Sequence, residues 1–244
     1  MKKLMAITVC LLLVMVLFLI GCGKRNSTSP QEINLNFDFS KGELGWIGDF
    51  VDLPDEEDMD HYDLKFGWVE RPSELGPGKA LMISGGNRSD DLFMYFRKQI
   101  GTAEGLKSNA TYKIVLKATF GSNAPANAVG IGGPPGEAVY VKVGAAVTEP
   151  VPVKVSGDDW WRLSVDKDNQ SGSGKDGVVV GDVSKPTSDD FETYELKTLE
   201  NAGAPLEVTT DANGNLWLFF GTDSGFEGTT TLYYTGLDVS LIEK

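Results

Sequence analysis

Alternating apolar and polar residues run through most of the chain beyond residue 32. The clearest example is TYKIVLKATF (111–120), and INLNFDF (33–39) shows the same period of two. Successive side chains of a β-strand point to opposite faces, so this pattern predicts half-buried strands. The apolar positions of the two segments are Ile33, Leu35, Phe37, Phe39, Tyr112, Ile114, Leu116, Ala118 and Phe120.

Other segments are apolar almost without interruption. AVYVKVGAAV (138–147) and NLWLFFG (215–221) are typical of central strands covered on both faces, and LDVSLI (237–242) predicts a final strand. Glycine-containing turn sequences separate these segments at short intervals. The chain is therefore expected to be all-β, with residues 33–244 forming a single antiparallel β-sandwich of the jelly-roll type.

The first 21 residues follow a different pattern. Lys2 and Lys3 precede an uncharged apolar stretch, 4–20, which is the layout of a bacterial export signal. A membrane-spanning helix needs about 20 apolar residues, so this stretch is marginal for that alternative. Residues 22–32 are rich in Gly, Lys, Asn, Ser, Thr and Pro, a composition that predicts a flexible linker.

The signal ends in Leu19-Ile20-Gly21-Cys22, which resembles the lipobox of bacterial lipoproteins. The resemblance implies cleavage after residue 21 and attachment of diacylglycerol and a further acyl chain, such as palmitate, to Cys22. Two acyl chains anchor a protein stably to a membrane. The resemblance thus implies a lipid-anchored, extracytoplasmic protein of the bacterial cell envelope, on the outer face of the cell membrane or in an outer membrane.

Several kinds of chemistry are excluded by what the chain lacks. Its two cysteines are Cys10, in the predicted signal, and Cys22, and its one histidine is His61. This set excludes internal disulfides and cysteine-based metal clusters. A single histidine nearly rules out multi-histidine zinc sites and Ser-His-Asp catalysis. The net charge of −13 is unfavourable for binding nucleic acid.

Three segments in order resemble the galactose-binding-like jelly rolls that include many carbohydrate-binding modules. They are FDFSKGELGW (37–46), GLKSNATYKIVLKATF (105–120) and LYYTGLDVSLI (232–242). Many such modules hold a structural calcium between their first and last strands, and the resemblance places its carboxylates at Asp38 and Asp238. Solvated aspartates at strand ends are the alternative. No other cofactor is expected.

Adjacent tryptophans give the candidate ligand site. Trp160 and Trp161 follow a turn-rich segment, and exposed aromatic rings suit the CH-rich faces of sugars. Neighbouring residues of a strand face opposite sides, which predicts that one of the two packs in the core. Trp46, Trp68 and Trp217 are expected to pack inside.

Two polar segments are expected to be solvated. DLPDEEDMDHYD (52–63) is strongly acidic and predicts an exposed loop. DKDNQSGSGKDG (166–177) has two aspartates at the spacing of a calcium loop, but its glycine and its last ligand are misplaced. It therefore predicts the tip of a hairpin.

Taken together, these features predict a membrane-anchored lipoprotein with a jelly-roll module that binds a polysaccharide or an envelope protein. One alternative is a jelly-roll glycoside hydrolase, since paired carboxylates are sufficient for that chemistry. The other is a structural envelope lipoprotein without a small ligand. Two α/β lobes, as in solute-binding lipoproteins, do not fit a chain without alternating helices.

Overall fold

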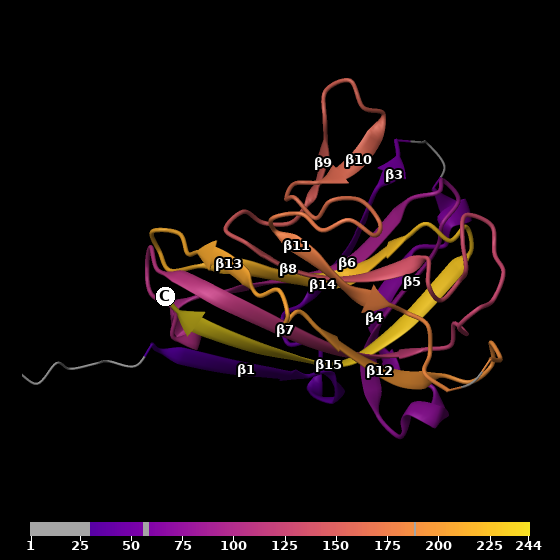
Figure 1. Ribbon diagram of the computed structural model, residues 1–244, viewed down its shortest axis with the longest axis horizontal. Helices are drawn as coiled ribbons and strands as arrows, with labels where there is room; N and C mark the ends of the chain where they lie inside the picture. Colours follow the sequence, from indigo (N-terminus) through magenta and orange to yellow (C-terminus); the bar gives the residue numbers. More distant parts are fainter. Residues whose placement is uncertain (1–29, 56–58, 188) are drawn as a thin grey trace, which may run out of the picture. The chain divides into compact units, whose positions relative to one another are not determined.

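Antiparallel strands form nearly all of the regular structure (Figure 1). The computed structural model describes residues 30–55, 59–187 and 189–244. Within these residues the longer sheet has seven strands: β1 (Glu32–Asp38), β4 (Lys65–Glu70), β5 (Lys79–Gly86), β7 (Thr111–Ser122), β12 (Glu195–Glu200), β13 (Leu206–Thr209) and β15 (Thr229–Glu243). Short 3-10 helices lie at η1 (Phe39–Lys41), η2 (Asp60–Tyr62), η3 (Ser73–Leu75) and η4 (Thr102–Glu104).

The second sheet has five described strands in the order β11-β8-β14-β6-β2. They are β2 (Ile47–Val51), β6 (Leu92–Ile100), β8 (Val139–Ala146), β11 (Gly177–Asp182) and β14 (Leu216–Ser224). A small third sheet joins β3 (Leu53–Pro54), β10 (Trp160–Leu163) and β9 (Pro152–Lys154), which lie together at the top of Figure 1.

The final strand, β15, organises the seven-stranded sheet. One of its edges pairs with β7, and the other pairs first with β5 and then with β1. Its buried side chains change phase at a bulge between Tyr234 and Gly236. Leu232 and Tyr234 point inward before the bulge, and Leu237 and Val239 point inward after it. An extra residue in one strand shifts its alternation in this way.

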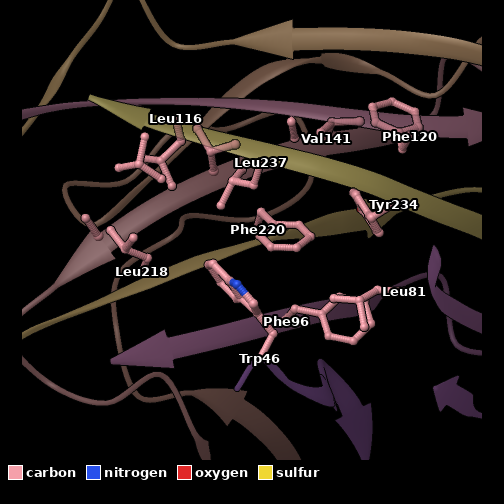
Figure 2. Close-up of a cluster of buried hydrophobic side chains, with 14 of the residues drawn as sticks. Trp46, Leu81, Phe96, Leu116, Phe120, Val141, Leu218, Phe220, Tyr234 and Leu237 are labelled. Carbon is pink, nitrogen blue, oxygen red and sulfur yellow. The ribbon is translucent and has the colours of Figure 1, made fainter. Parts of the chain in front are cut away.

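The main core lies between the two large sheets and is rich in aromatic rings (Figure 2). Phe220 of β14 has its ring centroid 4.7 Å from that of Tyr234, 4.8 Å from Trp46 and 5.7 Å from Phe96. The predicted inward positions of 111–120 are all fully buried in this core. Apolar burial of this kind is the dominant favourable contribution to folding.

The other face of the five-stranded sheet is also covered. The chain between β8 and β11, residues 147–176, contains β9 and β10 and folds over it. Phe93, Tyr95 and Phe219 point to this outer face and pack with Val165 in a second cluster. The central strands β8 and β14 are therefore buried on both sides, as the continuous apolar patterns of 138–147 and 215–221 predict.

These observations confirm the predicted all-β, antiparallel sandwich. Residues Glu32–Lys244 form one compact unit. The predicted signal, Cys22 and most of the predicted linker lie outside the described residues. Among the described residues, no helix is both long enough and apolar enough to span a bilayer.

Candidate functional site

Trp161 forms one wall of a shallow, mostly apolar pocket of about 330 Å³. The pocket lies where β2 leaves the five-stranded sheet and continues as β3 beside β10. The pocket is also lined by residues of β2 and of the small sheet and by two residues that precede β4. These residues are Asp49, Phe50, Leu53, Pro54, Pro152, Met59 and Leu64. This pocket, named here the Trp161 pocket, offers an aromatic face beside a carboxylate.

Polar groups hold the Trp161 indole in place. Its Nε1 donates a hydrogen bond to Asp55 Oδ1 at 3.2 Å, and the Lys154 ammonium lies 5.0 Å from the ring centroid. Lys154 also bridges to Asp55, and its hydrogen bond holds the pKa of that carboxyl below the ordinary value. The ring is therefore fixed before any ligand arrives, which reduces the entropy lost on binding.

Trp160 occupies a different environment. The Arg162 guanidinium lies 4.8 Å from its ring centroid, and Trp160 does not line the Trp161 pocket. Both tryptophans of β10 are half-buried, so the prediction that one of them packs in the core is wrong. The reason is that β10 belongs to the small sheet, which lies outside the sandwich. Of the other tryptophans, Trp46 is fully packed, whereas Trp68 and Trp217 are half-buried.

The two aspartates singled out for calcium lie on neighbouring strands, β1 and β15. Asp238 accepts hydrogen bonds from Asn36 Nδ2 at 2.6 Å and pairs with Lys117 Nζ at 2.8 Å. Asp38 accepts from the backbone and hydroxyl groups of Ser40, and its pKa is lowered chiefly by that hydroxyl. The Lys117 hydrogen bond is the main cause of the lowered pKa of Asp238. Calcium at this place stays a prediction.

A group of charged side chains, all but Arg162 buried, lies between the outer face of the five-stranded sheet and residues 147–176. We name it the buried charge network, and its members are Asp52, Asp91, Lys142, Arg162, Lys167 and Asp223. Formally these side chains carry three positive and three negative charges. Burying an ion without a partner is very costly, so such groups are expected in balanced sets.

Asp223 of β14 and Lys167 are at the centre of the network. Lys167 Nζ lies 2.6 Å from Asp223 Oδ2 and 2.7 Å from Asp52 Oδ2. Burial opposes the charge on Lys167, but these two carboxylates hold its pKa above the ordinary value. Lys142 Nζ, from β8, lies 2.9 Å from the same oxygen of Asp223. The side chains of Lys142 and Asp223 are both 0% exposed.

Arg162 connects the network to the strand that carries the tryptophans. Its Nη1 lies 3.2 Å from Asp52 Oδ1 and 3.3 Å from Asp91 Oδ2, and its Nε lies 2.9 Å from Asp158. The Asp52 backbone N–H also donates to the Trp161 carbonyl at 2.8 Å. Asp52 stands between β2 and β3 with φ +58°, a left-handed conformation that aspartate tolerates better than most residues. The network and the Trp161 pocket thus share a strand junction.

Asp91 is the unusual acid of the network. Burial raises its pKa to about 8, and the nearby carboxylates of Asp52 and Asp223 add to the rise. Its Oδ1 has no hydrogen-bond partner among the described residues. At neutral pH, Asp91 is therefore mainly a neutral carboxylic acid. Together with Asp52 and Arg162, it lines a polar pocket of about 350 Å³.

Three carboxylates close together raise the question of a metal. Oxygens of Asp52, Asp91 and Asp223 lie within 4.8 Å of one another. However, the Lys167 ammonium already contacts two of these carboxylates, and Lys142 and Arg162 add further positive charge. A divalent cation there would be repelled by its neighbours. The donor set fits a self-neutralised network rather than a metal centre.

Sequence reasoning did not identify this network. The segment around 166–177 was expected to be a solvated tip, and its Asp166 and Asp168 are exposed, but Lys167 points inward and is 5% exposed. Asp52, in the acidic run predicted to be an exposed loop, is likewise buried. A usable signal was the single lysine in AVYVKVGAAV, because a strand covered on both faces has no solvent for its charge.

Comparisons with known proteins gave structural neighbours only. No family model and no curated protein matches the chain. Among solved structures, the chain is similar to the CBM22-1 xylan-binding domain of Paenibacillus barcinonensis Xyn10C, with 9% identity and a TM-score of 0.37 over 88% of this chain and 97% of that one. The mannan-recognising module TmCBM27 gives 12% identity and a TM-score of 0.37 over 88% and 99%.

A third neighbour is the K1 cleaved adhesin domain of Lys-gingipain from Porphyromonas gingivalis W83. It gives 12% identity and a TM-score of 0.36 over 86% of this chain and 96% of that one. Because these identities and TM-scores are low, the fold is assigned from this chain's own topology. Its function is inferred from its own residues.

Proposed function

We propose that this chain is a lipid-anchored, extracytoplasmic envelope protein whose β-sandwich binds glycans at the Trp161 pocket. The observation that carries the glycan part is the half-buried Trp161 ring, fixed by Asp55 and Lys154 at the wall of an apolar pocket. Sugar rings combine apolar CH faces with hydroxyl groups. An aromatic wall beside carboxylate acceptors matches both features.

The anchor is supported by the sequence alone. A basic start, an uncharged apolar stretch and Gly21-Cys22 follow one another in the order that lipoprotein export requires. The acidic composition is unfavourable for direct attraction to anionic headgroups, so the acyl chains would provide the attachment. Cys22→Ser is expected to abolish fatty-acid labelling and to release the protein from the membrane fraction.

The test of glycan binding uses the full chain in detergent and a panel of soluble polysaccharides, including xylan, mannan and galactan. Calorimetry or affinity electrophoresis should find at least one polysaccharide that binds. Trp161→Ala should then weaken binding by about fivefold or more, since an aromatic stacking platform contributes at least about 1 kcal/mol. Absence of binding to the entire panel would favour the structural envelope role.

Trp160→Ala is the matched control, because it removes the same side chain from the same strand but not from the pocket. It should leave the affinity nearly unchanged. A larger loss with this variant would move the site to the other face of β10.

The same mixtures test the hydrolase alternative. Asp52 and Asp91 are the two buried carboxyl groups among those that line the polar pocket, but Arg162 binds both and Lys167 binds Asp52. We therefore expect no new reducing ends after prolonged incubation. Their appearance, and their loss with Asp91→Asn, would establish hydrolysis.

A further inference from the structure

Lys142 and Asp223 lie on neighbouring strands of the five-stranded sheet, and both are shielded from water. In the β8–β14 register, Lys142 lies opposite Gly221, and Asp223 lies opposite Tyr140, so the two side chains are diagonal neighbours on the same outer face. Lys142 Nζ is 2.9 Å from Asp223 Oδ2, and both side chains are 0% exposed. An amine and a carboxyl group are thus held in contact without competing solvent.

The surroundings of Lys142 suit a neutral amine as well as an ammonium. Its Nζ donates to the carbonyl of Lys167 at 2.8 Å and to that of Asp168 at 3.0 Å. A neutral amine has two N–H groups and one lone pair. The two carbonyls can accept both N–H groups, which leaves the lone pair facing Asp223. Burial, the main influence, lowers the pKa of Lys142.

Asp223 and Asp91 both keep an oxygen free for the transfer of a proton. Oδ1 of each has no hydrogen-bond partner among the described residues, and oxygens of the two groups lie within 4.8 Å. Asp91 is mainly neutral at pH 7, as described above. It can therefore give a proton to one oxygen and take one back from a neighbouring nitrogen.

From this geometry we propose that Lys142 and Asp223 join in an intramolecular amide, an isopeptide bond between β8 and β14. Proton transfer from the Lys142 ammonium to the Asp223 carboxylate gives the amine and the carboxylic acid. The Nζ lone pair attacks Cγ and forms the C–N bond. The nitrogen then loses a proton while one carboxyl oxygen gains it, the C–O bond breaks, and one water leaves.

Asp91 carries the proton between nitrogen and oxygen and ends unchanged, so no oxidant or other reactant is needed. Amide formation is unfavourable in bulk water, but here the reacting groups are dry and held together by two paired strands. Effective concentrations of about 10⁵ M and above are reached by well-oriented intramolecular reactions. Burial therefore removes the excess of water, and the paired strands remove the separation of the reactants, which both oppose amide formation in solution.

The same geometry distinguishes Lys142 from the other lysine of the network. Lys167 lies between two carboxylates at 2.6 and 2.7 Å, and both stabilise its charged form. A protonated amine has no lone pair with which to attack. Lys142 contacts one carboxylate and two neutral carbonyls, so losing its proton leaves fewer ionic contacts unmet.

Peptide mapping of the full-length protein tests the bond directly. The chain is purified, shown by circular dichroism to unfold cooperatively, then denatured and digested with trypsin. We expect a branched peptide that contains Lys142 and Asp223, is lighter than the two linear peptides by one water, and is uncleaved after Lys142. Linear peptides covering both residues, from folded wild-type protein, would overturn the proposal.

Variants identify the atoms involved. Asp223→Asn should give the same branched peptide, since ammonia leaves in place of water, whereas Lys142→Met should give none. Asp91→Asn should fold but form the bond about a hundredfold more slowly or worse. Lys167→Met should leave the bond at Lys142. A branched peptide that maps to Lys167 instead would also overturn the assignment.

Discussion

In the central strands of the five-stranded sheet, side chains on both faces are buried, but the two faces are built from different kinds of side chain. Phe219 and Phe220 are consecutive residues of β14, both 0% exposed, and they point to opposite faces. Phe220 enters the aromatic core between the large sheets (Figure 2). Phe219 enters the smaller outer cluster, beside the buried charge network. Burial alone therefore does not determine whether the side chains of a face are apolar or charged. The segment that covers the face determines it.

The difference follows from the covering layer. The inner face meets a second sheet, whose alternating strands supply apolar side chains at every contact. The outer face meets residues 147–176, a segment with short strands and polar turns. Such a segment cannot cover a sheet with apolar groups alone, and the charges of its Lys167 and Arg162 are both met by Asp52, which follows β2 of the sheet.

The largest loss of stability is expected from Phe220→Ala, about 4 kcal/mol, because a large ring among other rings leaves a cavity that rigid neighbours cannot fill. Phe219→Ala is the matched variant on the outer face. It should cost about 3 kcal/mol, since a covering loop can collapse further than a sheet. Urea unfolding measures both, and a larger loss with Phe219→Ala would break the comparison.

A somewhat smaller effect is expected from Lys167→Met. It leaves the buried Asp52 carboxylate with one cation fewer and should lower the free energy of unfolding by about 3 kcal/mol. Adding Asp52→Asn removes one negative charge and keeps a residue that tolerates positive φ. The double variant should therefore recover most of the loss. If the stability losses of the two single variants instead add up in the double variant, Lys167 and Asp52 are not coupled.

A further prediction concerns pH. The pKa of Asp91 is about 8 when folded, against an ordinary 3.8, so the folded protein binds an extra proton between these values. The stability that depends on this proton is complete below about pH 4 and is lost as pH rises towards 8. The difference in unfolding free energy, wild type minus Asp91→Asn, should fall over that range. If this difference in unfolding free energy does not change between pH 4 and pH 8, Asp91 does not belong to the network.

The fold was predictable because its signal is local. Alternation in 111–120 places five side chains correctly, and the apolar run 215–221 identifies a central strand from its own residues. The bulge near Gly236 is harder to anticipate, because it depends on how β15 meets its partners. A local pattern can show that a strand exists but not how it pairs.

The candidate site was predicted only in part. Trp160 and Trp161 were singled out as candidate ligand residues, but Trp161 shares its pocket with Phe50 of β2 and with Leu64, which precedes β4. The charge network joins residues from 52 to 223, and no sequence spacing connects them. Lys167 looked like a loop residue because Asp166 and Asp168 flank it, and Asp52 because it begins the acidic run 52–63. Their burial depends on the tertiary contact between 147–176 and the sheet.

The pairing of β1 with β15 has a mechanical consequence. β1 lies at the end of the sandwich that is remote from β3 and β10 (Figure 1). Its residues pair with those of β15 from Glu32–Ile242 to Asp38–Gly236. A force applied at Glu32 in the direction of β1 acts parallel to the strand. Its hydrogen bonds are then loaded together in shear, instead of one after another as in unzipping. With the anchor proposed above at Cys22, a domain loaded in this way would resist force far better than one whose strand is peeled off one hydrogen bond at a time.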